Sequence, residues 1–379
     1  MPRTPSLSEQ LAELIRRDTL AAQVAFLDSV ADMRRGVDMA ALRRAITAQS
    51  DAEAMAALNI DGAELDVFAN VLRQSYNEAG RTTAAALPQP PRDRTPPLPP
   101  QPPPGSPPGT PAGDPTGGKI VFRWSVQDPT SLAIIDKQAA DLVTRVTDET
   151  RQVVRTAISE GFQKGEHPDA IARRIAGTTN RVTGLREGGV IGLTEPQERY
   201  VASMRERLKS GTPDDLRYIL GIDRDGKATT GGMKRRDKRF DATIRKAIAS
   251  GDPIPAAMIE KMTSRYTERL VALRAETIAR TETGQSVMAA RHREFQRGLV
   301  QTGYPEEAVT KTWLHTARGD GRPWHAAMHD RSVQGLDTPF VLSTGVRMQH
   351  PLDITGGARE NASCRCSCTY EISFGWGID

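Results

Sequence analysis

A proline-rich segment constrains the fold of this chain more than any other feature. Residues 88–115 hold 14 of the 26 prolines found in 379 residues. Proline lacks a backbone N–H and has a fixed φ, so this segment cannot extend a helix or join a sheet. We expect an extended, polyproline-type linker over residues 88–118. An alternative interpretation is a docking motif for an aromatic groove on a partner.

Helical patterns occur on both sides of this linker. Ser6 and Glu9 have the spacing of a capping box, and Leu7, Leu11 and Leu14 then recur at helical intervals. We expect an N-terminal helical module at 1–87, the linker at 88–118, a helical region at 119–262 and a small α+β domain at 263–379. The predicted fold class is mostly α with a small C-terminal α+β domain, in an elongated, multi-module chain.

The pattern changes near residue 303. Residues 264–302 have the composition of one long helix or two abutting helices, and Gly303 is expected to end it. Proline at position 323 predicts the start of one short helix, Pro323–Asp330. Short alternating runs predict strands at Val309–Thr316, Phe340–Ser343 and Cys364–Phe374.

Composition excludes several classes of protein. No run approaches the roughly 18 apolar residues of a membrane span, and the N-terminus lacks the apolar core of a signal peptide. The three cysteines are confined to positions 364, 366 and 368, so a disulfide framework is not expected. These observations predict a soluble chain made in a cytoplasm, with no membrane span.

Charge is unevenly distributed along the chain. Residues 1–87 carry 9 Lys/Arg against 12 Asp/Glu, whereas residues 230–300 carry 15 against 8. The basic stretch can neutralise phosphates of double-stranded DNA without reading its sequence. The alternative is a solvated helical face with internal ion pairs. The candidate nucleic-acid contacts are Lys234, Arg235, Arg236, Lys238 and Arg239.

Six short motifs follow one another in the C-terminal hundred residues. They are Ile278-Ala-Arg-Thr-Glu282, Lys311-Thr-Trp313, Arg322-x-x-His325-x-x-Met328, Phe340, Met348-x-x-Pro351-x-Asp353 and Asn361-x-x-Cys364-Arg-Cys366. In order and spacing they resemble the conserved domain of the phage Mu F-like head morphogenesis family, over about residues 278–372. The matching signature residues are Arg280, Glu282, Trp313, Arg322, His325, Pro351, Asp353, Cys364 and Cys366.

The resemblance implies a structural role. Members of that family are minor capsid components, present in few copies and associated with the portal protein and other head proteins. They act in head assembly, DNA packaging or DNA delivery. We therefore expect a virion protein inside the head near the portal, made in the bacterial host cytoplasm, with double-stranded DNA as a further, sequence-nonspecific partner.

A metal site is one hypothesis for the histidines and cysteines of this domain. His325 and His329 are four residues apart, so on a helix they share a face, and Cys364 and Cys366 would supply thiolates to a structural zinc ion. On a straight strand, however, side chains two apart lie roughly 7 Å from each other, too far for one zinc. The alternative is that the cysteines pack as small hydrophobic residues and no cofactor is present.

Catalysis is the remaining alternative. Arg280, Glu282, Arg322, His325 and Asp353 are residue types that a nuclease or toxin-like enzyme acting on nucleic acid would use. No nucleophile elbow, phosphate-binding loop or paired-carboxylate motif accompanies them. We therefore expect no catalytic residue: Arg280 and Glu282 should hold a helix against the sheet, and His325 should cap or pack.

Overall fold

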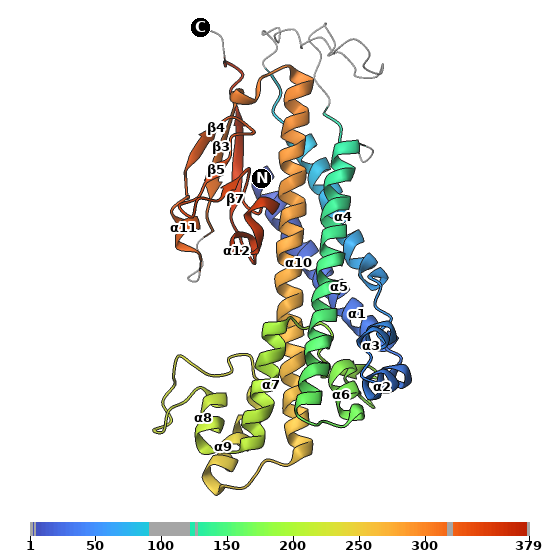
Figure 1. Ribbon diagram of the computed structural model, residues 1–379. Coiled ribbons are helices and arrows are strands. Elements are labelled where there is room, and N and C mark those ends of the chain that lie inside the picture. The colour runs from blue at the N-terminus through green and yellow to red at the C-terminus, as the bar shows by residue number, and fades with distance from the viewer. Residues whose placement is uncertain (1–2, 4, 91–121, 126–127, 317–320, 377–379) are drawn as a thin grey trace. The chain divides into compact units, whose positions relative to one another are not determined.

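Helices dominate the structure (Figure 1). The computed structural model describes residues 3, 5–90, 122–125, 128–316 and 321–376, so most of the expected linker lies outside the described residues. Apart from one two-residue strand pair, β1 (Thr178–Thr179) with β2 (Arg186–Glu187), the described strands lie beyond residue 308. This confirms the predicted fold class of mostly α with a small C-terminal α+β part.

The N-terminal helices begin at polar caps. Ser6 and Glu9 form the expected reciprocal pair, since the Ser6 N–H donates to Glu9 Oε2 at 2.7 Å and the Glu9 N–H donates to Ser6 Oγ at 3.3 Å. Asp38 and Ser50 cap the next two helices. The elements are α1 (Leu7–Gly36), α2 (Met39–Thr47), α3 (Asp51–Ala57), the 3-10 turn η1 (Ala63–Leu65) and α4 (Asp66–Ala86).

Several helices after the linker also begin at polar capping residues. His167 caps α6, and Pro168 occupies its first turn, where the missing N–H of proline costs no helical hydrogen bond. Thr212 caps α8 through its side-chain oxygen. The elements of this part are α5 (Pro129–Gln163), α6 (Pro168–Ala176), α7 (Glu195–Ser210), α8 (Pro213–Leu220), η2 (Lys238–Phe240) and α9 (Asp241–Ser250).

One helix of 47 residues, α10 (Ala256–Thr302), precedes the C-terminal strands. It begins eight residues earlier than the helix predicted at 264–302. Gly303 ends it with a φ of 72°, and the Gly303 N–H donates to Leu299 O at 2.8 Å. None of the described helices is both long enough and apolar enough to cross a membrane.

The C-terminal sheet has the order β4-β3-β7, and both neighbouring pairs are antiparallel. Several predicted bounds are wrong here. The last strand begins at Ser367 rather than Cys364, and the short helix ends at Ala326 rather than Asp330. Each of the three predicted strands also ends two residues earlier than expected, at Leu314, Val341 and Ile372. The elements are η3 (Glu306–Ala308), β3 (Val309–Leu314), α11 (Pro323–Ala326), β4 (Ser332–Gln334), β5 (Phe340–Val341), β6 (Arg347–Met348), η4 (Ile354–Gly356), α12 (Gly357–Asn361) and β7 (Ser367–Ile372).

The chain divides into two compact units, each assembled from separate stretches. Unit 1 comprises residues 1–23, 69–140 and 277–379, and unit 2 comprises residues 24–68 and 141–276. Helices α1, α4, α5 and α10 therefore contribute residues to both units. The linear domain boundaries at 87, 118 and 262 stay a prediction.

In unit 1 the sheet packs against the C-terminal part of α10 (Figure 1). Tyr370 of β7 stacks on Phe295 of α10 with ring centroids 4.6 Å apart. Arg291 of α10 donates to the Cys368 carbonyl at 2.6 Å. On β3, alternate residues are buried, and Trp313 is fully enclosed. The buried face of this sheet therefore faces a helix.

Both flanks of the proline-rich segment pack within unit 1, against the same turn of α10. Before the segment, Leu87 is buried, and a Cβ on Gly298 would lie only 2.9 Å from Leu87 Cδ1. After it, the Arg123 carbonyl accepts a hydrogen bond from Arg297 at 3.3 Å. Trp124 lies over Tyr76 of α4, with ring centroids 5.6 Å apart.

The interior of unit 2 contains a buried arginine. Arg34 of α1 is only 3 % exposed, and its guanidinium donates to the carbonyls of Ile191 and Gly189, each at 3.0 Å. It also pairs with Glu268 of α10 at 2.8 Å. Each of these interactions places an N–H opposite an oxygen, so the charge is compensated where it is buried.

Candidate functional site

Four side chains gather in unit 1 into what we call the thiol–imidazole cluster: His315, His325, Cys364 and Cys366. His315 follows strand β3, His325 lies in helix α11, and the two cysteines lie in the turn between α12 and β7. Three of them are buried, with exposed fractions of 1 % for His325, 5 % for Cys364 and 6 % for Cys366. The cluster is therefore built from three separate segments of the chain.

The turn before β7 brings the two cysteines together. Ser363 has a φ of 55°, and the Cys364 N–H returns to the Asn361 carbonyl at 3.0 Å. The Cys366 N–H then points at Cys364 Sγ, at 3.5 Å. The backbone thus bends around the first sulfur. The expectation of a straight strand through Cys364 and Cys366, which argued against a shared metal, is wrong.

The distances within the cluster are short. His325 Nδ1 lies 3.6 Å from Cys364 Sγ and 3.7 Å from Cys366 Sγ. These three ligand atoms all lie within 4.8 Å of one another. His315 adjoins this compact group of three, with its Nδ1 at 3.4 Å from Cys366 Sγ. Two sulfurs and one ring nitrogen therefore converge on one small volume, and a second ring nitrogen lies at its edge.

A buried carboxylate orients the central histidine. Glu360 is fully buried, and its Oε2 accepts hydrogen bonds from His325 Nε2 at 2.9 Å and from Trp324 Nε1 at 2.6 Å. Because Nε2 carries the proton toward Glu360, the lone pair of His325 Nδ1 is directed at the sulfurs. Burial acts to raise the pKa of Glu360, but the hydrogen bonds from Trp324 and His325 outweigh it and lower that pKa, so the carboxylate stays ionised.

The cysteines and His325 also shift one another's pKa. The hydrogen bond with Cys366 lowers the pKa of Cys364 below its ordinary value, and the contact with His325 adds to this effect. The same Cys364 contact raises the pKa of Cys366, as does burial. Burial lowers the pKa of His325, but the hydrogen bonds to Cys364 and Glu360 and the charge of Cys364 together outweigh burial and raise that pKa. The proximity of these three groups is thus one cause of the pKa shift of each of them.

His329 does not belong to this cluster, which corrects the predicted ligand set. The prediction placed His325 and His329 on one helical face, but α11 ends at Ala326 and His329 lies beyond it. Its side chain is 53 % exposed, and its Nδ1 accepts a hydrogen bond from the His315 N–H at 3.2 Å. The residue that sequence reasoning missed is His315 itself.

Cys368, the third cysteine, has a different role. It lies in β7 opposite Trp313, is fully buried, and burial raises the pKa of its thiol. It packs in the hydrophobic core as a small apolar side chain. The packing interpretation of the sequence therefore fits Cys368, whereas Cys364 and Cys366 face two imidazoles.

Other signature residues hold the segments that carry the cluster. Arg322 donates to the carbonyls of Arg359 at 2.7 Å and Ala362 at 2.9 Å, which fixes the end of α12 just before Cys364. Trp313 meets the rings of His325 and Phe340 edge-on, with centroids 5.4 Å and 5.3 Å apart. These contacts give both signature residues a structural role.

The remaining signature residues also make structural contacts. Asp353 caps η4 and accepts from the Gln349 N–H at 2.6 Å and the Thr355 N–H at 2.9 Å. Glu282 is buried and accepts a hydrogen bond from Gln138 of α5, and its expected role in holding a helix against the sheet stays a prediction. Pro351 is buried, and Arg280 is half-buried on α10.

The basic stretch is partly neutralised by its own carboxylates. Arg236 pairs with Asp241 at 2.8 Å, and Arg239 pairs with Asp237 at 2.6 Å. Arg239 lowers the pKa of Asp237 to about 2 through this hydrogen bond, although burial acts against it. In the part of the chain that the structure describes, three exposed cations of the predicted set make no ion pair: Lys234, Arg235 and Lys238.

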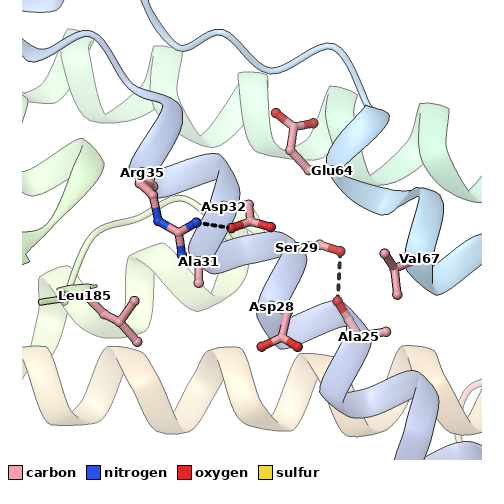
Figure 2. Close-up of a pocket in the computed structure, with 9 residues that line it drawn as sticks. All are labelled: Ala25, Asp28, Ser29, Ala31, Asp32, Arg35, Glu64, Val67 and Leu185. Carbon is pink, nitrogen blue, oxygen red and sulfur yellow. Dashed lines mark hydrogen bonds and ion pairs between the residues drawn. The ribbon is translucent and has the colours of Figure 1, made fainter. Parts of the chain in front are cut away.

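Unit 2 also carries an open hollow of about 360 Å³ beside α1. Figure 2 shows Asp32 paired with Arg35 and Ser29 bonded to the Ala25 carbonyl of its own helix. Glu64 and Asp28 lie apart from one another in this view. Because these polar groups do not converge on one point, the hollow is a weaker candidate for a binding or catalytic site than the thiol–imidazole cluster.

Comparisons with family models, with curated proteins and with solved structures give no match to this chain. The resemblance to the phage Mu F-like family therefore stays a prediction based on the motifs themselves.

Proposed function

We propose that the chain is a structural minor head protein of a tailed phage or prophage. In this proposal it associates with the portal protein and other head proteins, and acts in head assembly, DNA packaging or DNA delivery. It would reside inside the head near the portal after assembly in the host cytoplasm.

One observation carries the proposal: the motifs that resemble the family form a single packed arrangement. The Ser363 N–H donates to Thr281 Oγ1 of the first motif at 3.0 Å. Arg322 reaches the carbonyl just before that serine, and His325 contacts both Trp313 and Cys364. Residues that are far apart in the sequence thus depend on one another, as a shared domain signature would require.

Burial of the signature residue His325 and of its partner Glu360 favours a structural role over a catalytic one. His325 and Glu360 are the pair most suited to acid–base chemistry, yet they are 1 % and 0 % exposed. Both side chains bond to other residues of the domain. A nuclease would need its acid and base to reach a phosphate, so the enclosed position supports the head-protein proposal.

The proposal is tested in the phage or prophage that carries the gene. Purified particles should contain the chain in far fewer copies than the major capsid protein, as counted by quantitative mass spectrometry. Deletion of the gene should lower the yield of infectious particles, and the purified full chain should co-elute with the portal protein of the same phage.

Absence of the chain from particles, together with an unchanged yield after deletion, would overturn the proposal. Incubation of the full chain with DNA and RNA, with and without divalent cations, tests the nuclease alternative. Cleavage that is abolished in a His325→Ala variant, but retained in His329→Ala, would favour that alternative.

A further inference from the structure

We propose that the thiol–imidazole cluster is a structural zinc site whose ligands are Cys364 Sγ, Cys366 Sγ, His325 Nδ1 and His315 Nδ1. The site goes beyond the proposed head function and does not rest on it. It replaces His329, which the sequence favoured, by a histidine from the end of β3.

The chemical nature of the cluster supports a cation. Two thiols and two imidazoles are the ligands that structural Zn²⁺ prefers, in a Cys₂His₂ set. The cluster brings four such lone-pair donors next to one another, three of them buried. Buried lone pairs that meet without a donor are unfavourable unless protons or a metal lie between them.

The distances support zinc in particular. A tetrahedral ion with Zn–S bonds of about 2.3 Å and Zn–N bonds of about 2.0–2.1 Å places sulfur and nitrogen ligands roughly 3.6 Å apart. The three nitrogen-to-sulfur distances in the cluster are 3.4, 3.6 and 3.7 Å. Three edges of a coordination tetrahedron are therefore already present. His315, half-buried at the end of its strand, completes the set by turning toward the centre of the other three ligands.

The groups around the ligands match an outer coordination shell. Metal-bound histidines usually donate their second N–H to a carboxylate, which fixes the ring and makes it a stronger ligand. Here His325 Nε2 donates to Glu360 while Nδ1 faces the sulfurs. The Cys366 N–H directed at Cys364 Sγ would stabilise a thiolate charge in the same way.

Such an ion would join segments that are remote in the sequence. His315 follows β3, His325 lies in α11, and the two cysteines lie between α12 and β7. Helix α11 has only four residues, so it contributes few hydrogen bonds of its own. With four protein ligands and no open position, the site would hold these segments together rather than activate water.

The first test measures metal on the reduced full chain. Protein stripped with a chelator in the presence of a phosphine reductant is incubated with Zn²⁺ alone, desalted and analysed by mass spectrometry for zinc. We expect about one equivalent, and Co²⁺ in its place should give the intense visible bands of a tetrahedral thiolate site. Less than about a tenth of an equivalent, or a Cys364–Cys366 disulfide that forms equally well with zinc present, would overturn the proposal.

The second test compares two neighbouring histidines. His315→Ala should weaken zinc affinity at least tenfold in a competition titration against a chromogenic chelator, whereas His329→Ala should leave it unchanged. Neither side chain is part of the buried core, so both variants are expected to fold. Equal affinities in the two variants would remove His315 from the ligand set.

Glu360 supplies a third readout as a positioning residue. Glu360→Gln keeps the size of the side chain but removes the charge that faces His325 Nε2. Outer-shell changes of this kind cost about 10–100-fold in metal affinity. We expect that loss with one equivalent of zinc still bound at saturation, and an unchanged affinity would contradict the outer-shell role.

Discussion

In unit 2 the buried Arg34 guanidinium donates to backbone carbonyls and to Glu268, whereas in unit 1 the buried side chains of Cys364, Cys366 and His325 turn their lone pairs toward one another. Both groups are polar and both are buried. In the first, each donor already has an acceptor within the protein. In the second, two cysteine sulfurs and a ring nitrogen face one another, and only protons or a cation can lie between them.

The buried polar groups around Arg34 are already paired within the protein, whereas those of the thiol–imidazole cluster can still bind a cation. A buried guanidinium matched to oxygens stabilises the fold only while all partners are present, and it has no remaining capacity to bind a ligand. A set of converging thiols and imidazoles is satisfied by protons or by a cation. Chelation of zinc should therefore affect unit 1 and leave the Arg34 interactions of unit 2 unchanged.

The largest expected effect on the free energy of unfolding comes from replacing Arg34 in unit 2. Arg34→Ala would remove the donor to the carbonyls of Ile191 and Gly189 and the cation that pairs with Glu268. Loss of one partner from a buried ion pair costs about 3–5 kcal/mol. The free energy of unfolding, measured by urea titration, should fall by that amount with or without zinc.

The adjacent residue provides a matched control. Arg35 is on the same helix and pairs with Asp32, but its side chain is 67 % exposed. Exposed ion pairs are worth only about 0–1 kcal/mol, so Arg35→Ala should change the unfolding free energy within that range. Similar losses in the two variants would show that the burial of Arg34 has no energetic consequence.

A smaller effect is expected from Lys311, a buried cation in unit 1. Its ammonium donates to the Gln349 carbonyl at 2.9 Å, and burial lowers its pKa to about 8 although nearby Asp337 and Asp353 act in the opposite direction. Between pH 8 and 10.5 the unfolded chain holds this proton and the folded chain does not. Stability should therefore rise with pH across that window, by up to about 3 kcal/mol.

Lys311→Met isolates this contribution. The variant removes the titrating group, so its unfolding free energy should lack the rise that the wild type shows between pH 8 and 10.5. Urea titrations at about pH 7.5 and about pH 10 on both proteins provide the measurement. Parallel pH profiles would mean that Lys311 keeps an ordinary pKa in the folded chain.

The smallest expected effect on stability comes from the exposed cations of unit 2. Replacement of the three exposed cations Lys234, Arg235 and Lys238 by alanine should leave the unfolding free energy unchanged but lower the salt dependence of DNA binding. The slope of log affinity against log salt falls by about 0.9 for each phosphate that is no longer neutralised, so a change of about 2–3 is expected. The variant carries Lys234→Ala, Arg235→Ala and Lys238→Ala.

A charge-matched control distinguishes a local interaction from a general loss of positive charge. It removes three exposed cations of the acidic N-terminal part: Arg16, Arg35 and Arg44. An equal change of slope in the control would reject a specific DNA-contacting surface at residues 234–238. Absence of any salt-dependent binding by the wild type would reject the DNA interaction itself.

The sequence predicted those helix starts and ends that depend only on residues adjacent in the chain. The Ser6–Glu9 capping box and the end of α10 at Gly303 both depend on neighbouring residues, and both predictions are confirmed. The predicted class of fold is confirmed for the same reason, because helical periodicity extends over long segments.

The predictions were wrong where contacts with distant segments determine the backbone conformation. Alternation of apolar and polar residues predicted a strand from Cys364, but the chain bends around the Cys364 sulfur and β7 begins three residues later. Helical spacing predicted His329 as a ligand, although α11 has already ended. A usable signal did exist: the alternation of β3 places position 315 on the same face as Trp313.

The packing of Leu87 and Arg123 against one turn of α10 has a consequence for the integrity of the chain. Since the polypeptide departs from this turn and returns to it at nearly the same place, a protease cut between these positions would produce two fragments that remain interlocked by their shared core. Such nicked protein should elute intact from a sizing column and separate only in denaturant. Lengthening the chain between the two positions should be equally harmless, because each doubling of a loop costs only about 0.6 kcal/mol.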